Sequence, residues 1–138
     1  MTPQLFLFTG DDEAQIKSKA QQTVESLCPD LNDPFRLEIM SQEETESPDS
    51  LIERFTLSYM TPAFMGEKTL WLKNFMHFDK ENAKSNSPLA TNLRNFIDLL
   101  KEGLPHGIQV IISGPNCDQR KALFKTCAKL GETQLFKK

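Results

Sequence analysis

Acidic side chains follow the first apolar segment of the chain, where α/β proteins often bind phosphate or metal. Residues 5–8 are Leu-Phe-Leu-Phe, and Gly10, Asp11, Asp12 and Glu13 follow after a threonine. A loop that cradles a nucleotide phosphate needs several glycines, a lysine and a serine or threonine. This loop has one glycine, no lysine and three carboxylates, which repel a triphosphate. We therefore expect a degenerate nucleotide loop at residues 10–12, with no ATP hydrolysis, no catalytic residue and no cofactor.

The same acids allow a second interpretation, because receiver domains hold a divalent ion with paired acids after their first strand. That chemistry also requires an aspartate at the end of the third strand and a later lysine. Residues 72–74 are instead Leu-Lys-Asn, and residues 113–115 are Ser-Gly-Pro. A third interpretation needs no ligand, because carboxylates at a helix N-terminus satisfy its free N–H groups and its dipole. We prefer this helix cap, expect no metal, and keep a degenerate receiver-like regulatory domain with a divalent ion at Asp11 and Asp12 as the alternative.

Cysteine and histidine form no recognisable catalytic or metal-binding pattern. Cys28, Cys117 and Cys127 are an odd number without a C-x-x-C pair, and His77 and His106 are isolated. A disulfide framework and a zinc site are therefore disfavoured, and a reducing, cytoplasmic compartment is the simpler interpretation. The first apolar run is too short for a signal peptide or a membrane span, so we expect neither secretion nor a membrane partner.

A second candidate site is a turn that carries large apolar side chains. Pro62, Ala63, Phe64 and Met65 precede Gly66, and proline and glycine are typical of turns. Turn tips are normally polar, because they face water. An exposed phenylalanine and methionine would offer a partner a large apolar contact area. The alternative is that these two side chains fold under the sheet as part of the core, and the sequence leaves both interpretations open.

Charge is distributed unevenly along the chain, which has a net charge of −3. Residues 1–60 carry 4 basic and 12 acidic side chains, a net −8, whereas residues 114–138 carry 6 and 2, a net +4. The acidic first part argues against nucleic-acid binding by the whole chain, since phosphates are bound by clustered lysine and arginine. The basic end, with Arg120, Lys121 and Lys125, is either a contact for DNA or another partner or a solvated helix face.

Apolar periodicity predicts the elements that position these residues. We expect strands at residues 5–8, 35–39, 69–72, 108–112 and 133–136. We expect helices to begin at Asp11 or Asp12, Ser47, Ser87 and Asp118, whose side chains can cap free N–H groups. The run at residues 108–112 is the most apolar and should be a central strand, while Phe35, Leu37 and Ile39 should form the buried face of theirs. The alternation of strand and helix predicts an α/β domain with a mostly parallel five-stranded sheet covered by helices on both faces.

Three segments are more informative together, in their order along the chain, than each is alone. Residues 5–20 form a strand, a Gly-acid-acid loop and a helix. Residues 62–70 form an apolar turn that leads through Gly-Glu-Lys into a strand, and residues 108–125 form a late strand followed by an Asp-x-Arg-Lys helix. This ordered set resembles the delta subunit family of the bacterial DNA polymerase III clamp loader, over nearly the whole chain.

The resemblance implies a Rossmann-like fold of the AAA+ type, similar to P-loop NTPases, in a subunit that binds no ATP. It implies a noncatalytic accessory part of the DNA-directed DNA polymerase III holoenzyme, a nucleotidyltransferase complex. Such a subunit binds the sliding clamp (the beta subunit) and helps to open it for loading onto primed DNA in replication. Residues 1–138 would be its N-terminal domain. The lid and collar domains, which join the gamma/tau and delta prime subunits, would lie outside this chain, and primed DNA would be an indirect partner.

The family's clamp-binding pair lies in the apolar turn, which maps here onto Phe64 and Met65, with Pro62 and Ala63 beside them. The family commonly has Leu-Phe at this place, so this chain keeps the apolar character with other side chains. A protein that uses no nucleotide can still open a ring by binding the open form more tightly than the closed one. The resemblance thus implies clamp binding at this turn, with ATP hydrolysis left to other subunits.

Overall fold

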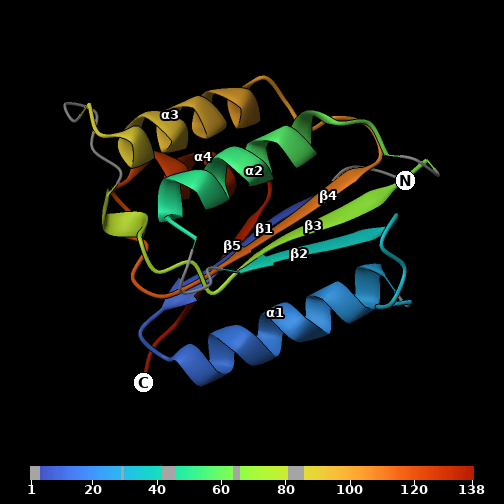
Figure 1. Ribbon diagram of the computed structural model, residues 1–138. Coiled ribbons are helices and arrows are strands. Elements are labelled where there is room, and N and C mark those ends of the chain that lie inside the picture. The colour runs from blue at the N-terminus through green and yellow to red at the C-terminus, as the bar shows by residue number, and fades with distance from the viewer. Residues whose placement is uncertain (1–3, 29, 42–45, 64–65, 81–85) are drawn as a thin grey trace.

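The structure, a computed structural model, describes residues 4–28, 30–41, 46–63, 66–80 and 86–138. Strands and helices alternate along the chain, as the apolar pattern predicts (Figure 1). The strands are β1 (Gln4–Gly10), β2 (Leu37–Ser41), β3 (Lys68–Lys73), β4 (Ile108–Ser113) and β5 (Glu132–Phe136). The helices are α1 (Glu13–Leu27), α2 (Pro48–Met60), α3 (Pro88–Lys101), α4 (Ala122–Leu130) and the short 3-10 helix η1 (Phe78–Lys80).

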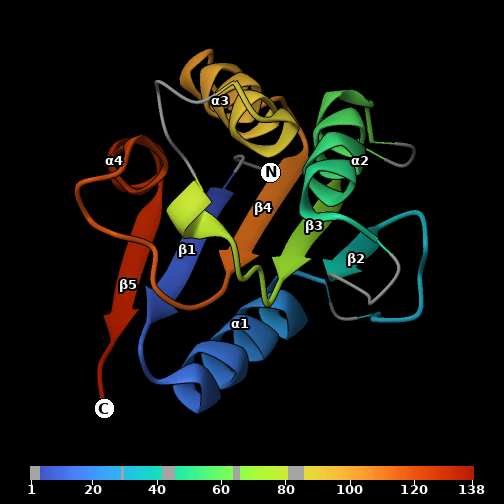
Figure 2. The same ribbon diagram turned by 60° about the vertical axis from the view of Figure 1, so that its left-hand side comes forward.

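The sheet of the described chain has five strands in the order β2-β3-β4-β1-β5, and every neighbouring pair is parallel. The connection from β1 to β2 runs one way along the sheet, and the three later connections run the other way. Because crossovers between parallel strands are right-handed, α1 must cover one face and α2, α3 and α4 the other, which is the arrangement in Figure 2. The predicted Rossmann-like α/β fold is confirmed, with β4 as the central, fully buried strand.

An apolar core lies on each face of the sheet. The larger core, under three helices, joins strand residues to helix residues that include Phe55, Phe96, Leu123 and Cys127. The smaller core packs the α1 residues Ile16, Ala20 and Val24 against Phe8, Trp71 and Ile111. The buried indole N–H of Trp71 donates a hydrogen bond to Ser113 Oγ at 2.9 Å, so this large side chain leaves no donor without a partner.

Three of the predicted helix starts are confirmed. The side chains of Asp12, Ser47 and Ser87 accept hydrogen bonds from backbone N–H groups three residues later, at 3.2, 3.4 and 3.2 Å. Gly103 follows the end of α3 with a φ of 100°, and its N–H donates to the Leu100 carbonyl at 3.0 Å. None of the described helices has the length and apolar character that crossing a bilayer requires.

The fourth helix start was predicted wrongly. Helix α4 begins at Ala122, and Lys121 precedes it without a side-chain cap. Asp118 lies earlier, where its carboxylate accepts hydrogen bonds from the backbone N–H of Arg120 at 2.8 Å and from its guanidinium at 2.7 Å. Because these local bonds occupy Asp118, the aspartate stabilises the turn before the helix and not the helix itself.

The predicted buried face of the second strand was also partly wrong. Phe35 lies before β2 and is 57% exposed, and Ile39 within β2 is 46% exposed, whereas Leu37 is buried. β2 is an edge strand, and α1 packs across β1, β3, β4 and β5. The part of the sheet that α1 covers therefore ends before Ile39. The alternation of apolar residues within one strand cannot show where a helix stops covering the sheet.

Candidate functional site

The loop after β1 is closed by the chain's own backbone. The N–H groups of Asp11 and Asp12 both donate to the carbonyl oxygen of Phe136, at 3.0 and 3.1 Å. In a phosphate-binding loop, N–H groups at this place point toward the ligand. Gly10 has a φ of 131°, and a Cβ there would lie 2.1 Å from the same Phe136 oxygen. The end of β5 therefore takes the position at these donors that a phosphate would need.

The two carboxylates of this loop also bind backbone N–H groups. Asp12 Oδ1 accepts from Gln15 at 3.2 Å, which is the helix cap that the sequence favours, and Asp11 Oδ1 accepts from Lys138 at 2.8 Å. The described residues contain no group of three or more His, Cys, Asp or Glu side chains that could hold a metal ion. The strand order also differs from the 2-1-3-4-5 order of receiver domains. The receiver-like alternative is therefore not supported.

The loop after β4 closes the same edge of the sheet. The N–H of Asn116 donates to the Gly10 carbonyl at 3.0 Å, and the N–H of Cys117 donates to Thr9 Oγ1 at 2.9 Å. Both Thr9 and Cys117 are buried. The carboxyl ends of β1 and β4, where α/β proteins usually bind ligands, are thus joined to each other by hydrogen bonds.

The apolar turn lies at the opposite edge, where the strands begin and where α2 leads into β3. Pro62 is exposed, and Ala63 is half-buried against the larger core. Phe64 and Met65 lie outside the described residues, so their role as exposed anchors stays a prediction. Gly66 is exposed and has a φ of 92°, a backbone conformation that glycine adopts readily.

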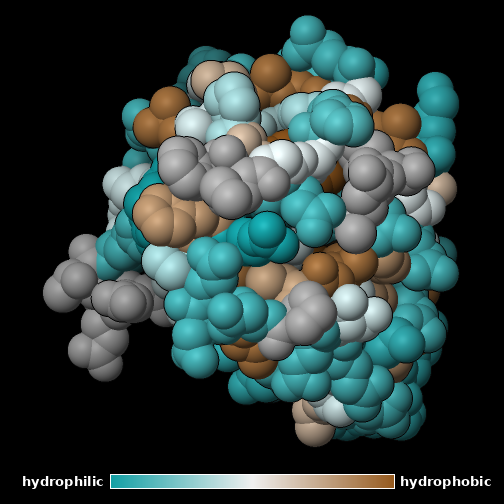
Figure 3. Space-filling model, turned by 90° about the vertical axis from the view of Figure 1, so that its right-hand side faces the viewer, coloured by the Kyte–Doolittle hydropathy of each residue, from teal (hydrophilic) through white to brown (hydrophobic). Residues whose placement is uncertain are grey.

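Large apolar side chains are exposed at the same edge of the sheet as this turn. Leu57 and Met60, on the last turn of α2, are 58% and 53% exposed, and Phe35 before β2 is exposed to a similar degree. Figure 3 faces the end of the molecule at which the strands begin, and hydrophobic atoms reach the surface there among hydrophilic ones. We call Phe35, Leu57 and Met60 the apolar rim of the turn.

The first residue of β3 joins this strand to the end of α2. Lys68 is only 5% exposed, and its Nζ donates to the carbonyl oxygens of Ser58 and Thr61 at 2.7 and 2.9 Å. Burial lowers the pKa of the Lys68 amine, and the negative charge of Glu38 acts in the opposite direction. Glu38 Oε1 also accepts a hydrogen bond from Ser58 Oγ at 2.7 Å, so strands β2 and β3 both hold the end of α2.

Tyr59 joins the ends of α2 and α3. Its hydroxyl donates to the Gly103 carbonyl at 3.3 Å, and its ring packs edge-on against Phe96, with ring centroids 5.6 Å apart. Burial raises the pKa of Tyr59 to about 12, and the nearby charge of Glu102 adds to this effect. The hydroxyl therefore stays protonated as a donor well above the ordinary pKa of tyrosine.

A pH titration can check this environment, because Tyr59 is the sole tyrosine of the chain. We expect its phenolate absorbance to appear with a pKa of about 12, not at the ordinary 10. The unfolded chain would release this proton first, so the stability contributed by Tyr59 is full below pH 10 and is lost as the pH rises toward about 12. The Tyr59→Phe variant should lack the absorbance change. Titration of the folded chain near pH 10 would contradict the buried environment.

A cavity of about 210 Å³ lies beside Lys68, and Cys28, Asp30, Arg36 and Glu67 are among the residues that line it. The thiol of Cys28 in this wall is a poor nucleophile, because burial raises its pKa. Its Sγ also donates a hydrogen bond to the Asp30 carbonyl at 3.4 Å. The cavity thus offers no reactive thiolate, and it lies away from the carboxyl edge of the sheet.

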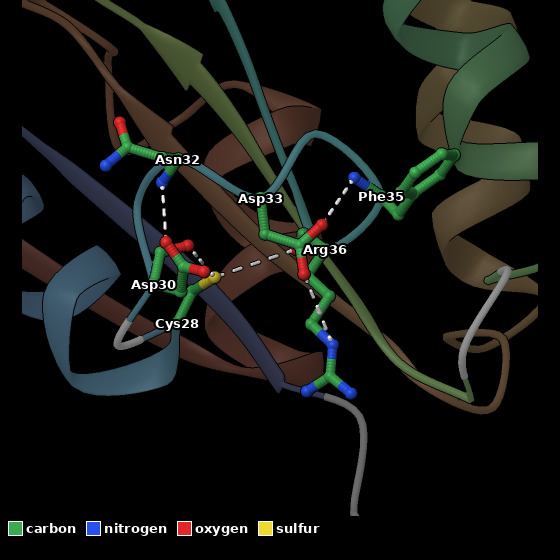
Figure 4. Close-up of polar contacts among 6 residues, drawn as sticks. All are labelled: Cys28, Asp30, Asn32, Asp33, Phe35 and Arg36. Carbon is green, nitrogen blue, oxygen red and sulfur yellow. Dashed lines mark hydrogen bonds and ion pairs between the residues drawn. The ribbon is translucent and has the colours of Figure 1, made fainter.

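The loop between α1 and β2, which borders this cavity, is held by its own polar groups (Figure 4). Asp30 Oδ1 accepts from the N–H of Asn32 at 3.0 Å, and Asp33 Oδ1 accepts from the N–H of Phe35 at 2.9 Å. Arg36 Nε lies 3.6 Å from Asp33 Oδ2. These contacts fix the backbone from which Phe35 of the apolar rim extends.

The predicted basic contacts lie before and on α4. Arg120 forms an ion pair with Asp118, at 2.7 Å between Nη2 and Oδ2. The Arg120 hydrogen bonds hold the pKa of Asp118 well below its usual range. Lys121 precedes the helix. The charge of Arg120 is therefore balanced within the chain, which reduces what it can offer to a phosphate.

Lys125 lines a groove of about 370 Å³ together with Lys101 and Lys129. Within the described part of the chain, none of these three lysines forms an ion pair. Lys101 and Lys129 lie in the last turns of α3 and α4, where a cation stabilises the helix dipole. Stabilisation of the helix ends alone thus accounts for the lysines at positions 101 and 129.

The structure keeps the three predicted regions apart. The degenerate loop lies at the carboxyl edge of the sheet, the turn lies at the amino edge, and the basic residues lie along α4 (Figure 1). The sequence reasoning missed the roles of Lys68 and of the Phe136 carbonyl. A lysine directly before a predicted buried strand could have indicated that Lys68 has a structural partner. The sequence carries no such signal for a backbone carbonyl.

Comparisons with known proteins give one family model and a similar fold. The model of a family described as DNA polymerase III, delta subunit, matches residues 6–136. Among solved structures, the Bacillus subtilis DNA clamp loader delta protein is similar in fold, with a TM-score of 0.68 at 16% sequence identity. The match covers 96% of this chain and 38% of that chain, so the present sequence spans well under half of the Bacillus protein. No curated protein matches the chain.

Proposed function

The chain belongs to the DNA polymerase III delta subunit family, and on this premise we propose that it binds a sliding clamp and helps to open it for loading onto primed DNA. In this proposal, residues 1–138 are the N-terminal AAA+-like domain of a longer subunit, and the domain is noncatalytic. Its share of the work is to bind the open or strained ring more tightly than the closed one, because only that difference in affinity shifts the ring toward opening.

The observation that carries clamp binding is the apolar rim around the turn. Leu57 and Met60 are more than half exposed on the last turn of α2, immediately before Pro62 and the proposed anchors Phe64 and Met65. Aromatic and methionine side chains at the centre of an interface supply much of its binding energy. A rim of further apolar side chains would exclude water around such anchors.

The closed loop after β1 supports leaving ATP hydrolysis to other subunits. The N–H groups of Asp11 and Asp12 are bonded to Phe136, and the two carboxylates would repel a triphosphate. We therefore propose that energy from ATP reaches this domain through the gamma/tau and delta prime subunits. These partners would bind parts of the subunit outside this chain.

A minor element of the proposal concerns primed DNA. Lys121 and Lys125 remain candidates for contacts to the phosphate backbone, with Arg120 a weaker one because Asp118 already neutralises it. Such contacts would be few and would weaken steeply with salt. The net charge of −3 favours an indirect role for DNA over a primary one.

Calorimetric titration of the chain into the purified sliding clamp of the same organism tests the proposal. We expect saturable binding with a dissociation constant of tens of micromolar or tighter, roughly −6 kcal/mol or more favourable. A folded chain that shows no binding heat and no clamp-dependent signal at those concentrations would overturn clamp binding. Family membership and the fold would remain.

A further inference from the structure

One residue holds the chain on both sides of the loop at residues 62–67. The Nζ of Lys68 donates to the carbonyl of Thr61, the last residue before the loop, at 2.9 Å. Lys68 is also the first residue after the loop, and its N–H donates to the Gly107 carbonyl at 2.7 Å. The side chain of Lys68 thus joins the residue before the loop to the residue after it.

The loop backbone is also in close contact with the turn before β4. A Cβ at Gly107 would lie 2.3 Å from the carbonyl oxygen of Gly66, so the two backbones meet without room for a side chain. Gly107 therefore adds a backbone contact at Gly66, near the end of the loop, to the hydrogen bonds that Lys68 makes at Thr61 and Gly107. The residues that flank the loop are thus held by β3, the end of α2 and the turn before β4.

A cation stabilises the end of α2, and the last turn of the helix supplies none. The last carbonyls of a helix carry partial negative charge, and at the end of this helix the Ser58 carbonyl accepts the Thr61 N–H, at 3.2 Å. The last turn of α2 contains no basic residue. Lys68 supplies the charge from β3, and it binds the Ser58 carbonyl at 2.7 Å in addition to that of Thr61. A lysine that is 5% exposed has lost most of its hydration, so these bonds are its main compensation.

We propose that Lys68 is a positioning residue for clamp binding, because its side chain fixes the path along which the chain leaves α2 toward Phe64 and Met65. This inference rests on the proposed function, since its consequence is measured as clamp affinity. A loop whose ends are fixed has fewer conformations to lose when a partner binds it. Removing the tie should therefore weaken clamp binding although Lys68 is too buried to contact the clamp itself.

The test compares Lys68→Met, which keeps the apolar stem and removes the donors, with Lys73→Met at the other end of β3. In Lys68→Met we expect amide hydrogen exchange to accelerate at Thr61, Ala63, Gly66 and Glu67, with exchange in α3 unchanged. We expect affinity for the purified sliding clamp to fall about tenfold, and Lys68→Arg to recover most of it. Lys73→Met should leave both measurements at wild-type values. If Lys68→Met does not fold, Lys68→Gln, whose head is too short to reach both carbonyls, replaces it.

The outcomes separate this inference from the proposed function. Unchanged exchange in the loop of Lys68→Met would overturn the positioning role, whatever the clamp does. Faster exchange in the loop with wild-type clamp affinity would also overturn it, while clamp binding would stand. Faster exchange throughout the core would show that Lys68 serves global stability alone. Failure of the wild-type chain to bind the clamp would overturn the proposed function and this inference together.

Discussion

Replacing Phe64 and Met65 together by alanine should weaken binding of the chain to the sliding clamp by at least roughly 100-fold, which corresponds to about 3 kcal/mol. Apolar anchors at the centre of an interface typically cost about 2 kcal/mol or more each when they are truncated, and paired losses are not additive. Calorimetric titration of the double variant beside the wild-type chain measures the difference. Circular dichroism should show an unchanged fold.

Met76→Ala is the matched control for this loss. Met76 is 48% exposed, but it follows the end of β3, at the edge of the sheet opposite the turn. We expect its clamp affinity to equal that of the wild type. If the double variant bound the clamp within about threefold of the wild type, Phe64 and Met65 would not be the anchors, since two central anchors cannot contribute so little. The apolar rim would then be the surface to examine.

The second large effect is expected at Gly10, where alanine should lower the free energy of unfolding by at least about 3 kcal/mol. The residue has a φ of 131°, and a Cβ would lie 2.1 Å from the oxygen and 2.7 Å from the nitrogen of Phe136. Because both atoms are backbone, relief requires that β5 move away from β1. Urea unfolding followed by the fluorescence of Trp71, the sole tryptophan, measures the change.

Gly103→Ala separates the two causes of this loss. Gly103 has a φ of 100°, similar in kind to that of Gly10, but a Cβ there would meet nothing within 4 Å. Only the strained backbone conformation would then cost stability, about 1 kcal/mol. Equal losses in the two variants would show that β5 yields easily, and would contradict a tightly closed loop.

The fold was predictable because its signals are local. The continuous apolar run at residues 108–112 predicts a strand buried on both faces, and the cap at Asp12 predicts the start of α1 from two residues close in sequence. The same patterns failed where tertiary position decides the outcome. Ile39 is exposed because the cover by α1 on the edge strand β2 reaches Leu37 but not Ile39. Asp118 is occupied by Arg120 before α4 begins.

The candidate site was less predictable, because its contacts join distant parts of the chain. The missing glycines and lysine of the first loop predict weak nucleotide chemistry, and this stays a prediction. The sequence could not show that the Phe136 carbonyl, from the last strand, accepts hydrogen bonds from the N–H groups of Asp11 and Asp12. It placed Lys68 in a family motif, but the reach of its amine to Thr61 depends on how α2 lies over β3.

The Phe136 carbonyl also acts as a tethered competitor. It is part of the chain, so its effective concentration at the N–H groups of Asp11 and Asp12 is in the millimolar range or above. A nucleotide would have to displace it and separate β5 from β1, which pair from Phe6 with Glu132 to Gly10 with Phe136. Introducing glycines and a lysine into the first loop should therefore not be enough to create a nucleotide site. The side chains of the loop and the position of the last strand each oppose phosphate binding, so changing the first alone leaves the obstacle of the second.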